Sequence, residues 1–578
     1  MRYCTRLGFL LGVLLVSGYA LAQAAGSAAH INAPGGNPRD LPVSPTVHHA
    51  SEEGRVVFRS QTVLIQVPVV VTDKAGAHIH GLPKEQFRIF EDGKEQKIAS
   101  FEEVVANNTP LAPSPAPAPG VFSNLAIPTG QPRSVTVIAI DLVNTPFLDQ
   151  AYGRQQLIKY LGDNLDSGQE IALVLFAGNG VKVLQGLTTD GSALISTLKT
   201  LGGQQPALQG VSQNSQRELS AFSSPLQGPG VTASASLSLR AFIDGGPDIA
   251  RAIQQDAILA TMEAFRTIAE ALSGIPGRKT LIWATSGFPF AMNSPDSSPV
   301  NLPLQSQSYE RTVAALNQAQ VSVYPVDVRG LVALGPTRGS TGPVLATSVL
   351  VKEQALQSTI DTMQNFAETT GGRAFYNRND VATGFRRAAD DASSYYLIEY
   401  YLDTHNNKAG WKNLKVKVAQ RDVQVRAREG FLMTSATMNP DTVRDADLKF
   451  VMNSPFDATG IPLTVRLRPA AGGGENSDKK AVGFTLQIAG KELTTMGSDS
   501  EIDVDVMAIA RSGTLIADNV AKNMKGKIPP EKLVRFKSEN VDYPGSFHLP
   551  SGNYELRFVV RDNQSGRMGS VTAPVTVD

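Results

Sequence analysis

The stretch Ser134–Gln150, SVTVIAIDLVNTPFLDQ, is the best guide to how this chain folds. Its apolar run, residues 135–140, is mostly β-branched and predicts a strand that is buried on both faces, as in a parallel sheet covered by helices. The run ends at Asp141, a polar loop follows, and Asp149 is expected to cap the next helix. Ligands of open α/β sheets bind beyond the carboxyl ends of the strands, so Asp141 is a candidate binding residue. The alternative is that Asp141 only caps its own loop.

Strands and helices alternate along the chain after this stretch. EIALVLFA, KTLIWATS and VSVYPVD are further buried runs, and amphipathic segments separate them. This alternation predicts an α/β fold with a doubly wound, mostly parallel sheet of Rossmann-like type. Alternating apolar and polar residues on either side predict flanking β-sandwich-like, Ig-like domains at the N-terminal and C-terminal sides.

Composition shifts mark the expected domain boundaries. Pro-rich and Gly/Ser/Gln-rich segments predict a linker and a surface insertion, because neither buries enough apolar side chain to offset the entropy of ordering. The expected parts are a signal peptide (1–24), a disordered tail (25–54), a small β domain (55–106), a Pro-rich linker (107–133), the central α/β domain (134–403, with a flexible insertion at 202–246), a β-hairpin extension (404–434) and a C-terminal β-sandwich (445–578).

The N-terminus has the pattern of an export signal. Arg2 and Arg6 precede the short apolar segment Leu7–Val16, and Ala20-Leu21-Ala22 is a small-x-small cleavage site. We therefore expect a secreted, periplasmic or envelope-associated protein that begins near Gln23 or, with Ala22-Gln23-Ala24 as the cleavage site, near Ala25. No later stretch is apolar and long enough to predict a transmembrane segment after signal cleavage.

The overall charge and the cysteine content exclude several classes of protein. Lys+Arg and Asp+Glu both number 53, so no basic excess favours nucleic-acid binding. The single cysteine, Cys4, lies in the expected signal, which leaves a mature chain without disulfides, Cys–zinc sites or Cys nucleophiles.

Several sequence blocks together resemble a known family. They are VVVTDKAG, QFRIFEDGKEQKIASFEE, IDLVNTPFLDQAYGRQQLIKYL, LQGLTTD, GRKTLIWATSGF, FAETTGGRAFYNRND and SYYLIEYYLD. The chain is similar to von Willebrand factor type A domains, and more narrowly to secreted VWFA-related proteins of acidobacteria. That resemblance implies a metal-ion-dependent adhesion site, where side-chain oxygens hold Mg²⁺ or Mn²⁺ and an acidic group of a partner completes the coordination.

The chain departs from the pattern of that metal site. Asp141 and Thr145 match the ends of D-x-S-x-S, but Val143 replaces the middle Ser, and Ser286 stands where a second Asp is usual. We therefore expect a degenerate site formed by Asp141, Thr145 and Ser286, which would hold Mg²⁺ or Mn²⁺ only weakly. The rest of the expected binding edge is Asn144, Thr285, Asp190 and Asp327.

Three classes of function are compatible with these observations. The first is an adhesion or binding protein that contacts a protein partner through the carboxyl edge of the central sheet. The second is a structural or scaffold component of an envelope complex without metal binding. The third, a hydrolase, is disfavoured because the sequence lacks G-x-S-x-G, H-E-x-x-H and P-loop motifs. We therefore predict a protein that is not an enzyme.

Overall fold

The computed structural model describes residues 62–105, 118–124, 134–163, 169–178, 180–201, 255–287, 302–331, 344–403, 410–433, 440–468, 479–495 and 500–578. The expected signal peptide, tail and insertion at 202–246 lie outside them. No described helix is long and apolar enough to cross a membrane.

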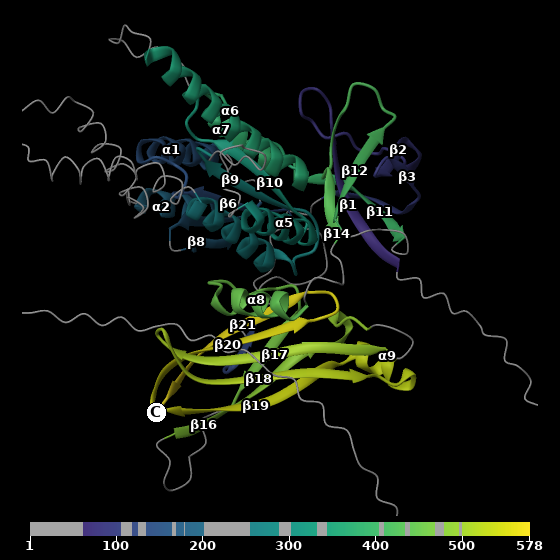
Figure 1. Cartoon of the computed structure of the whole chain (residues 1–578), viewed down its shortest axis with the longest axis vertical. Coiled ribbons are helices and arrows are strands. Elements are labelled where there is room, and N and C mark those ends of the chain that lie inside the picture. The colour runs from purple at the N-terminus through teal and green to yellow at the C-terminus, as the bar shows by residue number, and fades with distance from the viewer. Residues whose placement is uncertain are drawn as a thin grey trace, which may run out of the picture. The chain divides into compact units, whose positions relative to one another are not determined.

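A five-stranded sheet forms around β6 (Val135–Asp141) (Figure 1). Its order is β10-β9-β6-β7-β8; β6 runs parallel to β7 and β9, β9 runs parallel to β10, and β8 is antiparallel to β7. Every residue of β6, β9 and β10 is buried, as the apolar runs predicted. The other strands are β7 (Glu170–Ala177), β8 (Gly180–Thr188), β9 (Lys279–Thr285) and β10 (Val321–Asp327).

Alternate residues of β6 enter two separate apolar clusters. Val135, Val137 and Ala139 pack in one cluster, whereas Ile138 and Ile140 pack in the other, so both faces of the sheet are covered. The helices are α1 (Phe147–Asp163), α2 (Gly191–Thr200), a helix over 255–272, α5 (Leu302–Gln318), α6 (Val344–Thr370) and α7 (Val381–Asp390).

The start of α1 corrects one expectation. Asp149 does not cap this helix from outside, because α1 already begins at Phe147 and Asp149 lies in its first turn. A carboxylate in the first turn still stabilises the helix, because it interacts favourably with the positive end of the helix dipole. This explains why the sequence suggested a helix start there.

A second body of strands combines segments from both sides of the five-stranded sheet. β1 (Thr62–Thr72) pairs with β11 (Ser394–Asp403), which the sequence analysis had placed in the central domain. The sheet orders are β13-β1-β11-β4 and β14-β12-β2-β3. Their other elements are the 3₁₀ helix η1 (Lys84–Gln86), β2 (Phe87–Glu91), β3 (Lys94–Gln96), β4 (Ile98–Val105), β12 (Gly410–Val418), β13 (Gln424–Arg426) and β14 (Gly430–Met433).

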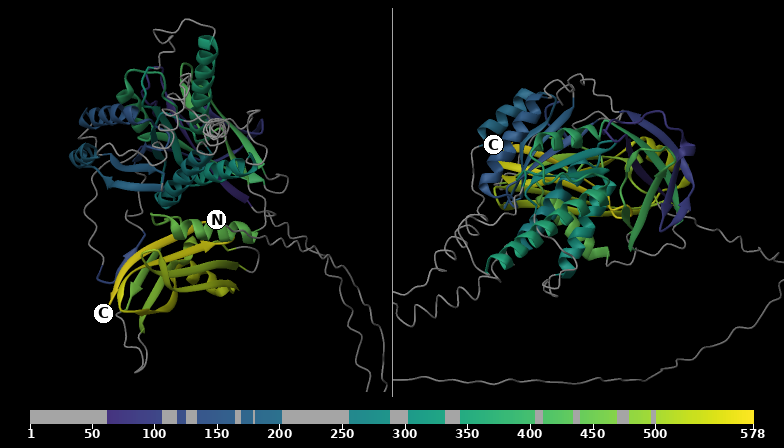
Figure 2. Two further views of the ribbon diagram at one scale, coloured as in Figure 1. Left: turned by 60° about the vertical axis from the view of Figure 1, so that its left-hand side comes forward. Right: turned by 90° about the horizontal axis from the view of Figure 1, so that it is seen from above.

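The C-terminal strands form two more antiparallel sheets around a shared apolar core, with the strands coloured green to yellow in Figures 1 and 2. Their orders are β19-β16-β15-β5 and β18-β17-β20-β21. β5 (Val121–Ser123) comes from the expected Pro-rich linker and pairs with β15. The remaining elements are α8 (Pro440–Asn453), β15 (Leu463–Leu467), β16 (Lys479–Ala489), η2 (Gly490–Glu492), β17 (Glu501–Ser512), β18 (Leu515–Lys527), α9 (Pro530–Ser538), β19 (Asn540–Pro550), β20 (Gly552–Asp562) and β21 (Met568–Val577).

The predicted fold class, an α/β protein with a doubly wound, mostly parallel sheet and flanking β-sandwich-like domains, is wrong for this chain. Strands account for 46% and helices for 30% of the described structure, and four of the five described sheets are antiparallel. The sequence analysis gave too much weight to the continuous apolar runs. The weaker alternating strands outnumber these runs, and much of their pairing joins segments far apart in sequence.

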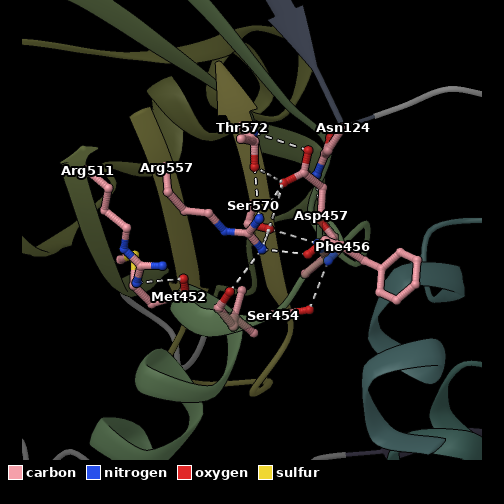
Figure 3. A network of polar contacts seen from close by, with 11 residues as sticks. Asn124, Met452, Ser454, Phe456, Asp457, Arg511, Arg557, Ser570 and Thr572 are labelled. Carbon is pink, nitrogen blue, oxygen red and sulfur yellow. Dashed lines mark hydrogen bonds and ion pairs between the residues drawn. The ribbon is translucent and has the colours of Figure 1, made fainter. Parts of the chain in front are cut away.

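A buried arginine fixes the loop that connects α8 to β15 (Figure 3). Arg557 on β20 is 4% exposed; its Nη2 donates to the carbonyl oxygens of Val451 (2.9 Å) and Phe456 (2.5 Å), and its Nη1 donates to Thr572 Oγ1 (2.8 Å). Asp457 pairs with the same guanidinium at 3.2 Å. These contacts join the loop to two strands of one sheet, and burial lowers the pKa of Arg557 against the opposing effect of Asp457.

Candidate functional site

Three strands of the five-stranded sheet end side by side. Ile140 lies opposite Ala284 in the β6–β9 pair, and Thr285 lies opposite Asp327 in the β9–β10 pair. Asp141, Thr285 and Asp327 therefore form a row at the carboxyl ends of β6, β9 and β10. We call this row and the loops that follow it the carboxyl edge.

Asp141 is almost completely enclosed within the carboxyl edge, with 1% of its surface exposed. Its Oδ1 accepts from the backbone N–H groups of Val143 and Asn144, both at 2.9 Å. Its Oδ2 accepts from Asn144 Nδ2 (2.7 Å), Trp283 Nε1 (2.9 Å) and Thr285 Oγ1 (2.8 Å). Burial raises the pKa of Asp141, and the donors on Asn144, Thr285 and Trp283 oppose that rise.

The other two expected metal ligands, Thr145 and Ser286, are joined by a hydrogen bond. Thr145 Oγ1 accepts from the backbone N–H of Ser286 at 3.1 Å, and both residues are at least 96% buried. Asn144 bridges Asp141 and the helix over 255–272, because its Nδ2 also donates to Thr261 Oγ1 at 2.9 Å. The expected residues thus lie together, and the oxygens of Asp141 and Thr145 accept hydrogen bonds from the protein, whereas the buried Ser286 Oγ has no partner within hydrogen-bond distance among the described residues.

A charged group lies next to this network, and its arginine was not anticipated. Arg329 follows β10 by two residues and donates from Nε and Nη2 to the two oxygens of Asp327, at 2.9 and 2.8 Å. Asp149 in α1 lies close to this pair: burial raises the pKa of Asp149, the charge of Asp327 raises it further, and Arg329 and the Ser286 hydroxyl lower it. The sequence signal for this group was an arginine two residues after a strand-end aspartate.

Asp190 does not belong to the carboxyl edge. It follows β8, which is antiparallel to β7, and the end of β8 lies beside Ile171 at the start of β7. Asp190 caps α2 by accepting from the backbone N–H groups of Ser192 (2.9 Å) and Ala193 (3.0 Å). The direction of β8 therefore places this carboxylate at the opposite end of the sheet.

No family model matches this sequence, and no curated protein matches it. The function has to follow from the geometry.

The arrangement around Asp141 does not fit a Mg²⁺ or Mn²⁺ ligand. A carboxylate offers about four lone-pair sites, and five protein donors already use those of Asp141. Hard divalent cations require free oxygens, usually with at least one carboxylate directly bound. Among the described residues, no group of three or more His, Cys, Asp or Glu side chains is placed to hold a metal ion.

Proposed function

We propose that this chain is an exported, non-enzymatic binding protein that holds a partner protein at the carboxyl edge, and that this edge works without a metal ion. The observation that carries the proposal is the charge group Asp149, Asp327 and Arg329. It lies beyond the carboxyl ends of parallel strands, where such sheets bind ligands; Asp327 ends β10, Asp149 lies in α1, and two hydrogen bonds to Asp327 hold Arg329 in the turn that follows.

The guanidinium of Arg329 takes the role that the family resemblance assigns to a cation. Arg329 uses two of its three guanidinium nitrogens on Asp327, and its side chain stays 22% exposed. An arginine held in this way presents its remaining donors to an acidic group of a partner, and pairing with a carboxylate is strong and directional. The partner chemistry that fits is therefore a surface carboxylate of another protein.

A matched set of variants tests this proposal. The chain from residue 25 onward is used to capture proteins from envelope extract, alone and as Arg329→Gln, Asp149→Asn and the control Arg386→Gln. Arg386 lies on α7 and forms an ion pair with Asp163 at 3.4 Å, so its loss removes one exposed cation away from the edge. Each capture is repeated with Mg²⁺ and with a chelator.

The expected result is one partner that both the wild type and Arg386→Gln capture equally in either buffer, and that Arg329→Gln captures at least about tenfold less. Capture that the chelator abolishes would contradict the metal-free edge. Capture that neither edge variant changes would favour the scaffold role, in which the sheet is only a folded support.

A further inference from the structure

A second candidate site lies outside the carboxyl edge, in a cavity of about 650 Å³. The end of α6, the segment 372–378 and strand β13 line it, and α6 packs beside β10 (Figure 1). This volume is in the range of a small-molecule or peptide-segment site. None of the carboxyl-edge residues lines the cavity, so this inference does not depend on the proposed function.

Arginines dominate the charge of this cavity. Arg373, Arg378 and Arg426 line it. Burial lowers the pKa of Arg373, and the charges of Arg426, Arg387 and Arg378 lower it further. Arg426 is paired with Asp391 at 2.6 Å. Within the described residues, Arg373 and Arg378 form no ion pair, although the charge of Asp391 acts on Arg373 from a distance.

One acidic side chain also lines the cavity. It is Glu368, whose pKa is raised by burial and, to a smaller extent, by the neighbouring charge of Glu429. The charged lining is therefore Arg373, Arg378, Arg426 and Glu368, and acidic groups of a ligand would pair with the arginines.

Backbone geometry adds a second property, an open sheet edge. The backbone N–H of Phe375 donates to the Pro325 carbonyl, and its carbonyl accepts from the N–H of Asp327, both at 2.8 Å, so Phe375 extends the sheet beyond β10. Backbone groups alternate in direction along an extended chain, so those of Ala374 and Tyr376, which both line the cavity, point away from β10. The opposite wall, β13, is itself the edge strand of its sheet.

The walls of the cavity are held firmly. Gly371 has a φ of 77° at the end of α6, and a Cβ on Gly372 would lie 2.0 Å from the Val323 carbonyl oxygen. The backbone N–H of Glu429 donates to the Glu368 carbonyl at 3.0 Å, which connects α6 to the segment behind β13. A site of this rigidity loses little entropy when it binds.

We propose that this cavity binds an extended acidic segment of a partner protein, which adds as a strand along residues 373–376 and places its carboxylates on Arg373 and Arg378. Strand addition supplies affinity through the backbone, and pockets for alternate side chains supply specificity. The open backbone edge favours a peptide over a small anion, because a small anion would use only the arginines.

Fluorescence anisotropy with a labelled octapeptide of alternating Glu and Val tests the proposal on the full chain. The comparison peptides are the same sequence with Lys in place of Glu, and the Glu-Val peptide with N-methyl groups on alternate backbone nitrogens. The variants are Arg373→Gln/Arg378→Gln, the charge reversal Arg373→Glu/Arg378→Glu, and the control Arg535→Gln. Arg535 is an exposed cation of α9, paired with Glu539 at 3.0 Å.

The wild type and Arg535→Gln should bind the Glu-Val peptide alike, and the double Gln variant should bind it at least about tenfold more weakly. The charge-reversed variant should gain binding of the Lys-Val peptide, a result that a merely misfolded protein cannot give. N-methylation should weaken binding by a similar factor. If the N-methylated peptide binds as tightly as the unmethylated one, the cavity binds anions without strand addition. If the double Gln variant binds the Glu-Val peptide as tightly as the wild type does, the cavity is not the binding site.

Discussion

Removing the carboxylate of Asp141 should destabilise the five-stranded sheet far more than an ordinary strand-end substitution. Asp141→Ala leaves the Nε1–H of Trp283 and the backbone N–H of Val143 buried without their acceptor. Each buried donor that loses its acceptor lowers the free energy of unfolding by about 1–3 kcal/mol, and removing the cost of burying the carboxylate raises it by about 1 kcal/mol. The expected net loss in free energy of unfolding is about 3 kcal/mol.

Tryptophan fluorescence gives a local readout of this loss. The chain holds 2 tryptophans, so a Trp411→Phe background leaves Trp283, which is fully buried beside Asp141, as the only reporter during urea unfolding. The matched control is Asp190→Ala, which removes a carboxylate that also accepts two backbone N–H groups but is exposed at a helix N-cap. That change should cost about 1 kcal/mol.

Two results would refute the reasoning about Asp141. One is a loss no larger than that of Asp190→Ala, which would mean that the donors find other acceptors. The other is a rise in the wild-type unfolding midpoint on adding Mg²⁺ at about 10 mM that Asp141→Ala abolishes, because a ligand that binds only the folded state stabilises it by mass action. That rise would show that Asp141 takes part in a metal site, as the family resemblance implied.

Three further predictions concern other parts of the chain. Burial raises the pKa of Glu270 to about 7 against the opposing charge of a nearby arginine, so the contribution of Glu270 to stability is fully present below about pH 4.5 and is lost as the pH rises through about 7. Urea titrations of the wild type should therefore show a loss of about 3 kcal/mol over this pH range, and Glu270→Gln should remove that loss. The control Glu263→Gln, at an exposed position of the same helix, should keep the loss. Arg557→Met removes the guanidinium from the half-buried carboxylate of Asp457 and leaves the carbonyl oxygens of Val451 and Phe456 without their donor. It should lower stability by about 3 kcal/mol, measured by thermal unfolding, whereas an unchanged melting temperature would show that this network contributes nothing. Gly372→Ala drives a methyl group into the Val323 carbonyl and should cost about 2 kcal/mol or more by the same measurement, and a neutral effect would mean that the end of α6 shifts freely.

The local signals in the sequence identified single elements well. The apolar run before Asp141 became β6, with every residue buried as expected. The pairing of β1 with β11 had no local signal, because Gln66 and Glu399, which bond at 2.7 Å, are 333 positions apart. Register between such distant strands depends on the whole fold, and this explains why the fold class was misjudged.

The candidate site also has parts that the sequence predicted and parts that it did not. The neighbourhood of Asp141 and Thr285 followed from the rule that parallel strands end at one edge, and the structure brings their side chains to 2.8 Å. Trp283 was interpreted only as core, although a buried indole N–H requires an acceptor and so pointed to a nearby carboxylate. Asp190 was misplaced because the antiparallel direction of β8 is not visible in its apolar pattern.

The charges of the carboxyl edge explain how a sheet of this kind can bind a partner without a metal ion. A divalent cation is useful at such an edge because it neutralises strand-end carboxylates and still attracts an acidic group. Here one strand-end carboxylate, Asp141, is neutralised by five protein donors, and another, Asp327, is neutralised by Arg329. A chelator cannot remove Arg329. Partner binding at this edge should therefore respond to salt, which screens the partly exposed guanidinium, and not to metal availability.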